Sequence, residues 1–239
     1  MLTIGMLGGM SAQSSGEYYR LANELVAERL GGLHSAQCLL YSVDFATIEE
    51  LQVAGRWDDA AAVLTRAARA VQAGGADLLV LCTNTMHIVA DQIQAGIDIP
   101  LLHIVDVTAA AVIAAGLDTV GLLATDFTAQ QPFYVNRMRS HGVSVLVPEV
   151  ADQALVHRVI YDELCRGVVR AESRDGYRDV MRRLVAGGAQ GVVLGCTEVE
   201  LLVGAADIDV PVFPTTRLHV AAAVDRALAG RPHLDHGPA

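Results

Sequence analysis

Two stretches of this 239-residue chain repeat each other without a gap. The eleven residues from Ala73 to Thr83 (AGGADLLVLCT) align with those from Ala186 to Cys196 (AGGAQGVVLGC), and six positions are identical. One spacing, 113 residues, separates every aligned pair, so Thr83 and Cys196 occupy equivalent positions. A duplicated unit can face its copy across a cleft and supply one proton-handling group from each side. That arrangement suits chemistry on both faces of one carbon atom.

Further matches extend the repeat toward both ends of the chain. Thr3–Leu7 (TIGML) resembles Thr119–Leu123 (TVGLL), with Tyr18 matching Tyr134 at the same spacing of 116 residues. Ala109–Val112 resembles Ala221–Val224 at a spacing of 112. Small changes in spacing are expected where insertions fall in surface loops. The chain therefore consists of two copies of one unit.

Composition and charge exclude several classes of protein. Hydrophobic residues make up 52% of the chain, which is enough for a buried core, while the net charge is −10. This charge argues against nucleic acid and anionic membrane surfaces as partners. No apolar run approaches the length of a membrane span, and the N-terminus does not resemble a signal peptide. Four cysteines without disulfide-framework spacing favour a reducing, cytoplasmic location.

Short apolar runs alternate with amphipathic segments, which is typical of βαβ units. The predicted strands are 3–7, 36–43, 77–81, 100–104, 119–124, 143–147, 191–195 and 210–213. The predicted helices are 14–30, 57–73, 84–95, 107–115, 129–141, 152–166, 173–186, 198–202 and 217–229. The runs rich in Val, Ile and Leu suit strands that are buried on both faces of a parallel sheet.

These elements predict an α/β fold with two pseudo-symmetric, flavodoxin-like lobes. Each lobe has a roughly four-stranded parallel sheet flanked by helices. Residues 1–104 with 215–239 form the first lobe, because the last helix is expected to fold back onto it, and residues 105–214 form the second. Residues 230–239 lack an apolar period and are expected to be a frayed tail.

Cys196 is the strongest single candidate for chemistry. It directly follows a predicted strand, and ligands in open α/β sheets bind beyond the carboxyl ends of the strands. We expect it to open a helix capped by Thr197, whose N-terminus would lower the pKa of the thiol. The alternative is a buried, inert cysteine.

Thr83 and its neighbours form the matching candidate in the first unit. Its hydroxyl can donate a proton or position a water, or it can simply cap the helix from Asn84. Cys82 should point away, because side chains alternate along a strand. His87 follows one helical turn later and could support the same cleft, although a lone histidine on a helix is often structural. Glu198 could orient the Cys196 thiol, meet a substrate ammonium or favour a helix N-terminus.

The sequence predicts neither a cofactor nor a metal site. His34, His103 and His219 have no spacing typical of metal ligands. The glycine loop Gly5–Gly9 does not match a dinucleotide fingerprint, and no phosphate-binding loop motif occurs.

Several motifs in order resemble the aspartate/glutamate racemase family over nearly the whole chain. They are Gly8–Ser11 (GGMS), Thr83–His87 (TNTMH), Pro100–Ile104 (PLLHI), Gly121–Thr125 (GLLAT) and Gly195–Glu198 (GCTE). The resemblance implies two flavodoxin-like lobes, frequent homodimers and cofactor-independent racemisation at a cleft between the lobes. It places catalysis on Cys196 and Thr83. Candidate substrate-binding residues are Met10, Ser11, Gln52, Asn84, Thr85, Thr125, Thr197 and Glu198, with His87 as a possible support.

The chain departs from the family pattern at two positions. The first catalytic cysteine of the family is replaced by Thr83, which resembles a branch with a Thr/Cys pair. Aspartate-specific relatives carry a basic residue on the loop after the second strand, where this chain has Gln52. Recognition of an acidic side chain is therefore in question.

Together these residues predict an isomerase that racemises an amino acid, either aspartate and glutamate or a broader range. Cys196 would act as the base on one face of Cα, and Thr83, directly or through water, would serve the other. Two alternatives remain open at this point. One is a single-thiol decarboxylase of a disubstituted malonate on the same fold, and the other is a non-catalytic amino-acid-binding protein.

Overall fold

The computed structural model describes residues 1–230, so the predicted tail beyond Gly230 lies outside the described residues. Two parallel sheets of four strands each organise the chain. The first has the order β2-β1-β3-β4, with β1 at Ile4–Gly8, β2 at Cys38–Ser42, β3 at Leu78–Leu81 and β4 at Leu101–Leu102. The second has the order β6-β5-β7-β8, with β5 at Thr119–Leu123, β6 at Ser144–Leu146, β7 at Gly191–Leu194 and β8 at Val212–Pro214.

The identical strand orders match the sequence repeat. β1 corresponds to β5, and β3 to β7, at the centre of each sheet. Each central strand is an apolar run that is almost wholly buried, as expected for parallel strands covered on both faces. The predicted α/β fold with two pseudo-symmetric lobes is confirmed.

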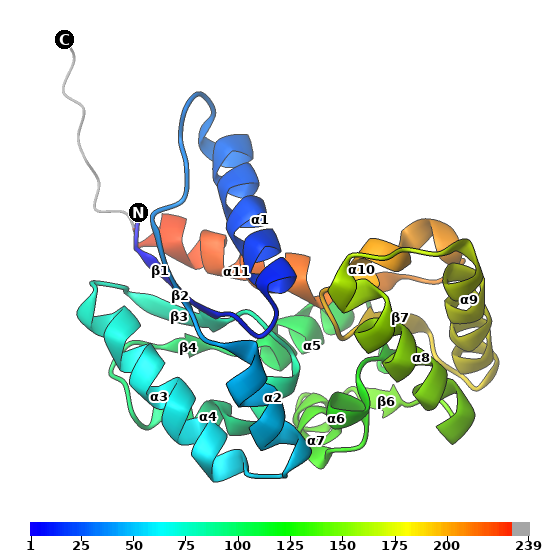
Figure 1. The fold of residues 1–239 in the computed structure, drawn as a ribbon. Coiled ribbons are helices and arrows are strands. Elements are labelled where there is room, and N and C mark those ends of the chain that lie inside the picture. The colour runs from blue at the N-terminus through cyan, green and yellow to red at the C-terminus, as the bar shows by residue number, and fades with distance from the viewer. Residues whose placement is uncertain (231–239) are drawn as a thin grey trace.

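Helices of different lengths connect the strands and cover both sheets (Figure 1). The α-helices are α1 Ala12–Leu30, α2 Phe45–Val53, α3 Trp57–Ala73, α4 Ala90–Gln94, α5 Ile104–Ala114, α6 Asp126–Ala129, α7 Pro132–Ser140, α8 Val150–Asp162, α9 Ala171–Ala186, α10 Val199–Leu202 and α11 Thr215–Ala229. Short 3-10 helices occur at η1 Thr85–Val89, η2 Leu164–Arg166 and η3 Ala205–Asp207.

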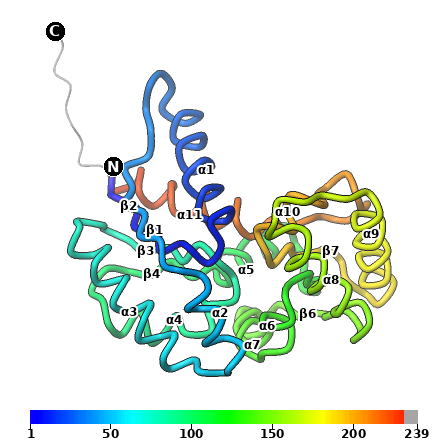
Figure 2. The backbone as a smooth tube through the Cα atoms, in the orientation of Figure 1, coloured from blue at the N-terminus to red at the C-terminus, as the bar shows by residue number. Residues whose placement is uncertain are grey.

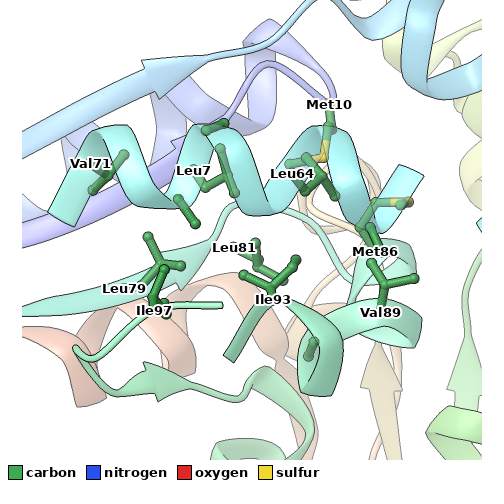
Figure 3. Packing of buried hydrophobic residues seen from close by; sticks show 14 of the residues in the cluster. Leu7, Met10, Leu64, Val71, Leu79, Leu81, Met86, Val89, Ile93 and Ile97 are labelled. Atoms are coloured by element: carbon green, nitrogen blue, oxygen red, sulfur yellow. The ribbon is translucent and has the colours of Figure 1, made fainter. Parts of the chain in front are cut away.

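The first sheet has a separate hydrophobic core on each face. On one face α3 and α4 pack over the strands, and Figure 3 shows Leu64 and Val71 of α3 beside Leu7 and Leu81. On the other face α1 and α11 bury Ile4, Met6 and Val80. The alternation of side chains along each strand distributes successive residues between these two cores.

The second sheet is covered in the same way. α8 and α9 pack on one face around Leu123, Val192 and Leu194. α5 and α7 pack on the other face around Val120, Leu122 and Val193.

The helix after the last strand of each sheet crosses to the other sheet. α5 follows β4 but packs in the core of the second sheet, and α11 follows β8 but packs in the core of the first. Figure 2 shows this return, with α11 in red lying near α1 and β1. α5 and α11 also contact each other. Because the crossing is reciprocal, the two halves are joined by matched connections.

Some predicted elements differ from those observed. Residues 45–53 were expected to be a loop, and this was wrong: they form α2, whose N-terminus is capped by the Asp44 side chain at Ala46 N. The helix predicted over 84–95 is divided into η1 and α4. The helix predicted over 129–141 is divided into α6 and α7, and Pro132 begins the second because its fixed φ suits a first helical position. No helix within residues 1–230 is both long and apolar enough to cross a bilayer.

Candidate active site

A small pocket lies where the carboxyl ends of the central strands of the two sheets meet, and it encloses about 40 Å³. Ligands of open α/β sheets bind at such strand ends. The lining residues come from both halves of the chain: Met10, Ser11, Ser14, Phe45, Gln52, Thr83, Asn84, Thr85, Thr125, Ile160, Tyr161, Cys165, Gly195, Cys196, Thr197 and Glu198.

Thr83 and Cys196 both line this pocket, each just beyond the end of its central strand. The structure therefore brings the two repeat-equivalent residues to one cavity. Cys82 is fully buried in the core between the first sheet and helices α1 and α11, and burial raises its pKa. It is absent from the pocket lining, as expected from the alternation of side chains along β3.

The thiol of Cys196 is hydrogen-bonded to a carboxylate. Its Sγ donates to Oε2 of Glu198 at 3.0 Å. Burial, with the nearby Glu198 charge, raises the pKa of Cys196 well above its usual value. The prediction of a lowered pKa was wrong because desolvation and a neighbouring negative charge both disfavour a thiolate. The unliganded site holds a protonated thiol next to a hydrogen-bond acceptor.

Thr197 does not cap the helix after Cys196, contrary to the prediction. The helix α10 begins only at Val199 and spans four residues, with Glu198 in the cap position. The Thr197 hydroxyl instead accepts from Thr216 Oγ1 at 2.9 Å and lies 2.8 Å from Ser14 Oγ. Thr197 therefore links the second sheet to the first turns of α1 and α11.

Glu198 connects the two halves of the pocket. Its Oε1 accepts a hydrogen bond from Ser11 Oγ at 2.5 Å, while Oε2 accepts from Cys196. Ser11 also occupies the N-cap position of α1, where Oγ accepts from Ser14 N at 3.3 Å. The carboxylate is thus oriented by one hydroxyl from the first half of the chain and one thiol from the second.

The Thr83 side chain is not a helix cap. Asn84 occupies the N-cap position of η1, and within residues 1–230 the Thr83 hydroxyl makes no hydrogen bond. The backbone carbonyl of Thr83 accepts from Nδ1 of His87 at 2.8 Å. The hydroxyl of Thr83 therefore remains available to the pocket, while its backbone carbonyl is held by His87.

Of the two roles that the sequence left open for His87, the structure fits the structural one. His87 is buried and does not line the pocket. Its Nε2 accepts from Ile104 N at 3.2 Å, so Nδ1 carries the proton donated to Thr83. Burial, with the neighbouring His103 and His219, lowers the pKa of His87 well below its usual value. The neutral His87 ring therefore links the backbone of the turn at Thr83 to the start of α5 through two hydrogen bonds.

Asn84 contributes an unpaired acceptor to the pocket wall. Its Nδ2 donates to Thr215 Oγ1 at 3.0 Å, and Thr215 Oγ1 in turn donates to Leu194 O. This chain of bonds fixes the orientation of the amide. Oδ1 of Asn84 is buried without a hydrogen-bond partner in the described part of the chain. Buried acceptors are nearly always paired, so Oδ1 suits a donor supplied by a ligand.

Free backbone donors surround the same space. Among residues 1–230, the N–H groups of Asn84, Thr85, Cys196 and Thr197 donate no hydrogen bond. They lie in the turns that follow β3 and β7, where such groups commonly bind anions. The pocket can therefore hold a carboxylate without a cationic side chain.

Thr85 and Thr125 hold the opposite part of the pocket together. The Thr85 hydroxyl lies 3.3 Å from that of Thr125 and 3.0 Å from that of Thr128. All three side chains are buried. This hydroxyl cluster joins η1 of the first half to α6 of the second.

Gln52 and Met10 form part of the wall contributed by the first lobe. Gln52 lies on α2, not on the loop that the sequence predicted, and its Nε2 points to Met86 Sδ at 2.9 Å. Both Gln52 and Met10 are buried. The amide nitrogen of Gln52 is therefore already hydrogen-bonded, and the side chain carries no charge.

The sequence did not indicate six of the lining residues as members of the site. These are Ser14, Phe45, Ile160, Tyr161, Cys165 and Gly195. Ser14 carried a usable signal, since it lies one helical turn after Ser11. Tyr161 and Cys165 lie far along the chain on α8 and η2, and only the packing of those elements against the second sheet brings them to the pocket.

No metal centre accompanies this site in residues 1–230, where no cluster of three or more His, Cys, Asp or Glu side chains could hold an ion. His87, His103 and His219 lie close together, with ring centroids of His87 and His103 4.6 Å apart. Both ring nitrogens of His87 and of His219, and Nδ1 of His103, are engaged with backbone groups or with Tyr18, which favours a structural role for the cluster.

Comparison with known proteins identifies the family. A profile described as Asp/Glu/hydantoin racemase matches residues 7–223. The chain belongs to this family. Racemases are isomerases, and the family supports amino-acid racemisation in general.

Solved structures share the fold over most of the chain. A Yersinia pestis protein provisionally described as an Asp/Glu racemase is 50% identical, with a TM-score of 0.90 over 95% of this chain and 100% of that one. An aspartate racemase homologue from Pyrococcus horikoshii is 28% identical, with a TM-score of 0.86 and the same coverage. Glutamate racemase from Francisella tularensis, solved with D-glutamate, is 14% identical, with a TM-score of 0.66 over 95% of this chain and 81% of that one. The last likeness concerns the fold alone.

Proposed function

We propose that this protein racemises an amino acid without a cofactor, by removing and returning the Cα proton between Cys196 and Thr83. The observation that carries the proposal is that these two repeat-equivalent residues line one small pocket, with Glu198 bonded to the thiol. A thiol and a hydroxyl from opposite halves of a duplicated fold can serve opposite faces of one carbon.

The pocket offers complementary partners for the two ends of an amino acid. The free N–H groups at Asn84, Thr85, Cys196 and Thr197 suit the α-carboxylate. The unpaired Oδ1 of Asn84 and the Glu198 carboxylate suit the ammonium group. Donors that are already oriented toward the carboxylate would stabilise the negative charge that develops when Cα loses its proton.

The proton steps follow from the contacts of Cys196. The Sγ proton passes to Glu198 Oε2, which already accepts it in a hydrogen bond, and leaves a thiolate. The Cα–H bond breaks as its proton moves to sulfur, and the electron pair is delocalised onto the substrate carboxylate. A proton is then delivered to the other face of Cα from the Thr83 hydroxyl, directly or through one water. Solvent restores the proton of Thr83, and Glu198 releases to solvent the proton that it took from Cys196, which returns both groups to their starting states. In the reverse direction the two groups exchange roles.

Proton exchange at Cα tests the proposal directly. Incubation of L- and D-amino acids with the enzyme in deuterated water should replace the Cα–H signal in the ¹H NMR spectrum, with the opposite enantiomer appearing on a chiral column. Alanine, serine, asparagine, aspartate and glutamate form the first set of substrates to test. Saturable binding without exchange for any amino acid would contradict racemisation and favour a binding protein.

A further inference from the structure

Charge is distributed unevenly in the proposed substrate pocket. Among its sixteen lining residues there is one carboxylate, Glu198, and no lysine, arginine or histidine. The Glu198 side chain is buried and already holds hydrogen bonds from Ser11 and Cys196. The pocket therefore has a negative group but no positive side chain to balance a second substrate carboxylate.

Two neighbouring aromatic side chains, Tyr161 and His157, do not supply a positive charge to the pocket. Tyr161 lines the pocket, and its pKa is raised chiefly by burial, with smaller contributions from acidic groups that include Glu49 and Glu198. His157 lies beside Tyr161, with ring centroids 4.7 Å apart. His157 is not among the lining residues, and its Nδ1 is engaged by Asp126, accepting from the backbone N at 3.2 Å and lying 3.8 Å from Oδ2.

The rest of the lining is apolar or neutral apart from Glu198. Met10, Phe45 and Ile160 contribute apolar surface. Gln52 lies among them with its amide nitrogen directed to Met86 Sδ. A carboxylate placed against these side chains would lose its hydration without gaining an ion pair, which is strongly unfavourable.

The turns after β3 and β7 explain why one carboxylate is nevertheless accepted. Four backbone N–H groups without an acceptor lie in those turns, on residues that line the pocket, and can replace the water around a single carboxylate. They belong to the part of the pocket that also holds Thr83 and Cys196, so they suit the group attached to the reacting carbon. A second carboxylate would find further unpaired N–H groups, such as those of Met10, Ser11 and Thr125, but no cationic side chain among the lining residues.

We infer that the substrate is an amino acid whose side chain is uncharged, and that Gln52 is a position that determines this specificity. The inference rests on the proposed racemase function and narrows its substrate class. It excludes aspartate and glutamate as the preferred substrates of this chain.

Pairs of substrates that differ only in charge test the inference on the unmodified enzyme. Asparagine matches aspartate in shape, and glutamine matches glutamate. We expect α-proton exchange in deuterated water to give a kcat/KM at least about tenfold higher for the amide of each pair, because the carboxylate must be desolvated without a cationic partner. Alanine and serine should exchange as well.

The possible results separate this inference from the function on which it rests. Exchange that is as fast or faster with aspartate or glutamate overturns the inference, while racemisation stands. Absence of exchange with every amino acid overturns both.

A substitution at Gln52 tests the same point from the protein side. Gln52→Arg would add a permanently charged, bidentate partner for a carboxylate, and we expect it to raise the aspartate-to-asparagine ratio of kcat/KM by at least about tenfold. Glu50→Lys is the matched control, since it adds positive charge on the exposed side of the same helix and should leave the ratio unchanged. An unchanged ratio in folded Gln52→Arg contradicts the role of Gln52. If that variant does not fold, the ratio of the wild-type enzyme still decides the substrate class.

Discussion

The turns after β3 and β7 occupy equivalent positions in the repeat. Each is hydrogen-bonded to the start of a long helix, but through a different side chain. In the first turn, His87 accepts a hydrogen bond from Ile104 N at the start of α5. In the second, Glu200 accepts one from Thr216 N at the start of α11, at 2.7 Å. His87 and Glu200 are separated by the repeat spacing of 113 residues. Each turn is thus tied to the helix that crosses to the other sheet.

The residues in front of these ties have diverged toward different chemistry. Thr83 corresponds to Cys196, and Thr85 to Glu198. The first turn therefore presents hydroxyls, with Thr85 bonded to other threonines. The second presents a thiol bonded to a carboxylate. The duplicated backbone frame was retained while the groups facing the pocket became unequal, which is consistent with the proposed pairing of a thiol with a hydroxyl.

Removing the thiol of the second turn should have the largest effect on the rate of α-proton exchange. We expect Cys196→Ala to lower α-proton exchange by about 10⁴-fold, because the proposed base is lost. The measurement is deuterium incorporation at Cα. Cys38→Ala is the matched control, since Cys38 is a half-buried thiol outside the pocket, and its exchange rate should be unchanged. Full exchange by Cys196→Ala would refute a catalytic thiol.

Replacing the hydroxyl of the sister residue should have the next largest effect. Thr83→Val keeps the shape of the side chain and removes its oxygen, so we expect a loss of about 10³-fold in exchange. Thr83→Ser restores a hydroxyl and should recover most of the rate. Thr83→Cys should still fold and should change the ratio of the L- and D-enantiomer rates. If Thr83→Val exchanges both enantiomers normally, Thr83 has only a structural role.

The smallest expected effect concerns the hydrogen bonds that Glu200 and His87 make to the crossing helices. Their contributions to the free energy of unfolding should depend on pH in opposite directions. Burial raises the pKa of Glu200 from 4.5 to about 7, so the folded state holds this proton more tightly than the unfolded state does. The stability that it contributes is complete below pH 4.5 and is lost as the pH rises through 7. Burial lowers the pKa of His87, so its contribution is present above pH 6.5 and is lost as the pH falls.

Urea unfolding between pH 4.5 and 8 can measure both contributions. We expect Glu200→Gln to remove a decline of about 2–3 kcal/mol in the free energy of unfolding across the upper part of this range. His87→Gln should instead flatten the decline on the acidic side. Identical pH profiles for the wild type and both variants would contradict the buried titrations.

Much of the fold followed from local features of the sequence. The repeat predicted two equivalent sheets, and runs such as Leu78–Leu81 and Gly191–Leu194 located their central strands. The helix α2 was missed because residues 45–53 follow a turn and carry only a weak amphipathic pattern. The predicted homodimer, the cytoplasmic location and the division into lobes at residues 104 and 215 stay predictions, and light scattering after size-exclusion chromatography can test the first.

The candidate site was predictable where it follows the strand ends and unpredictable where it depends on packing. Thr83 and Cys196 were found because the repeat aligns them. Tyr161 and Ile160 were not, because no local pattern shows that α8 covers the second sheet beside the pocket. The pKa of Cys196 was predicted in the wrong direction, since an expected helix N-terminus near a cysteine says nothing of how deeply the thiol is buried or how close a carboxylate lies.

By itself the sequence determined the duplicated α/β frame and the placement of a threonine and a cysteine at sister strand ends, because apolar periodicity and repeat spacing are local properties. Only the tertiary structure decided which groups surround them. Burial and distance set the protonated state of Cys196, the neutral state of His87 and the lack of a cation in the pocket, and these depend on segments separated by a hundred residues or more.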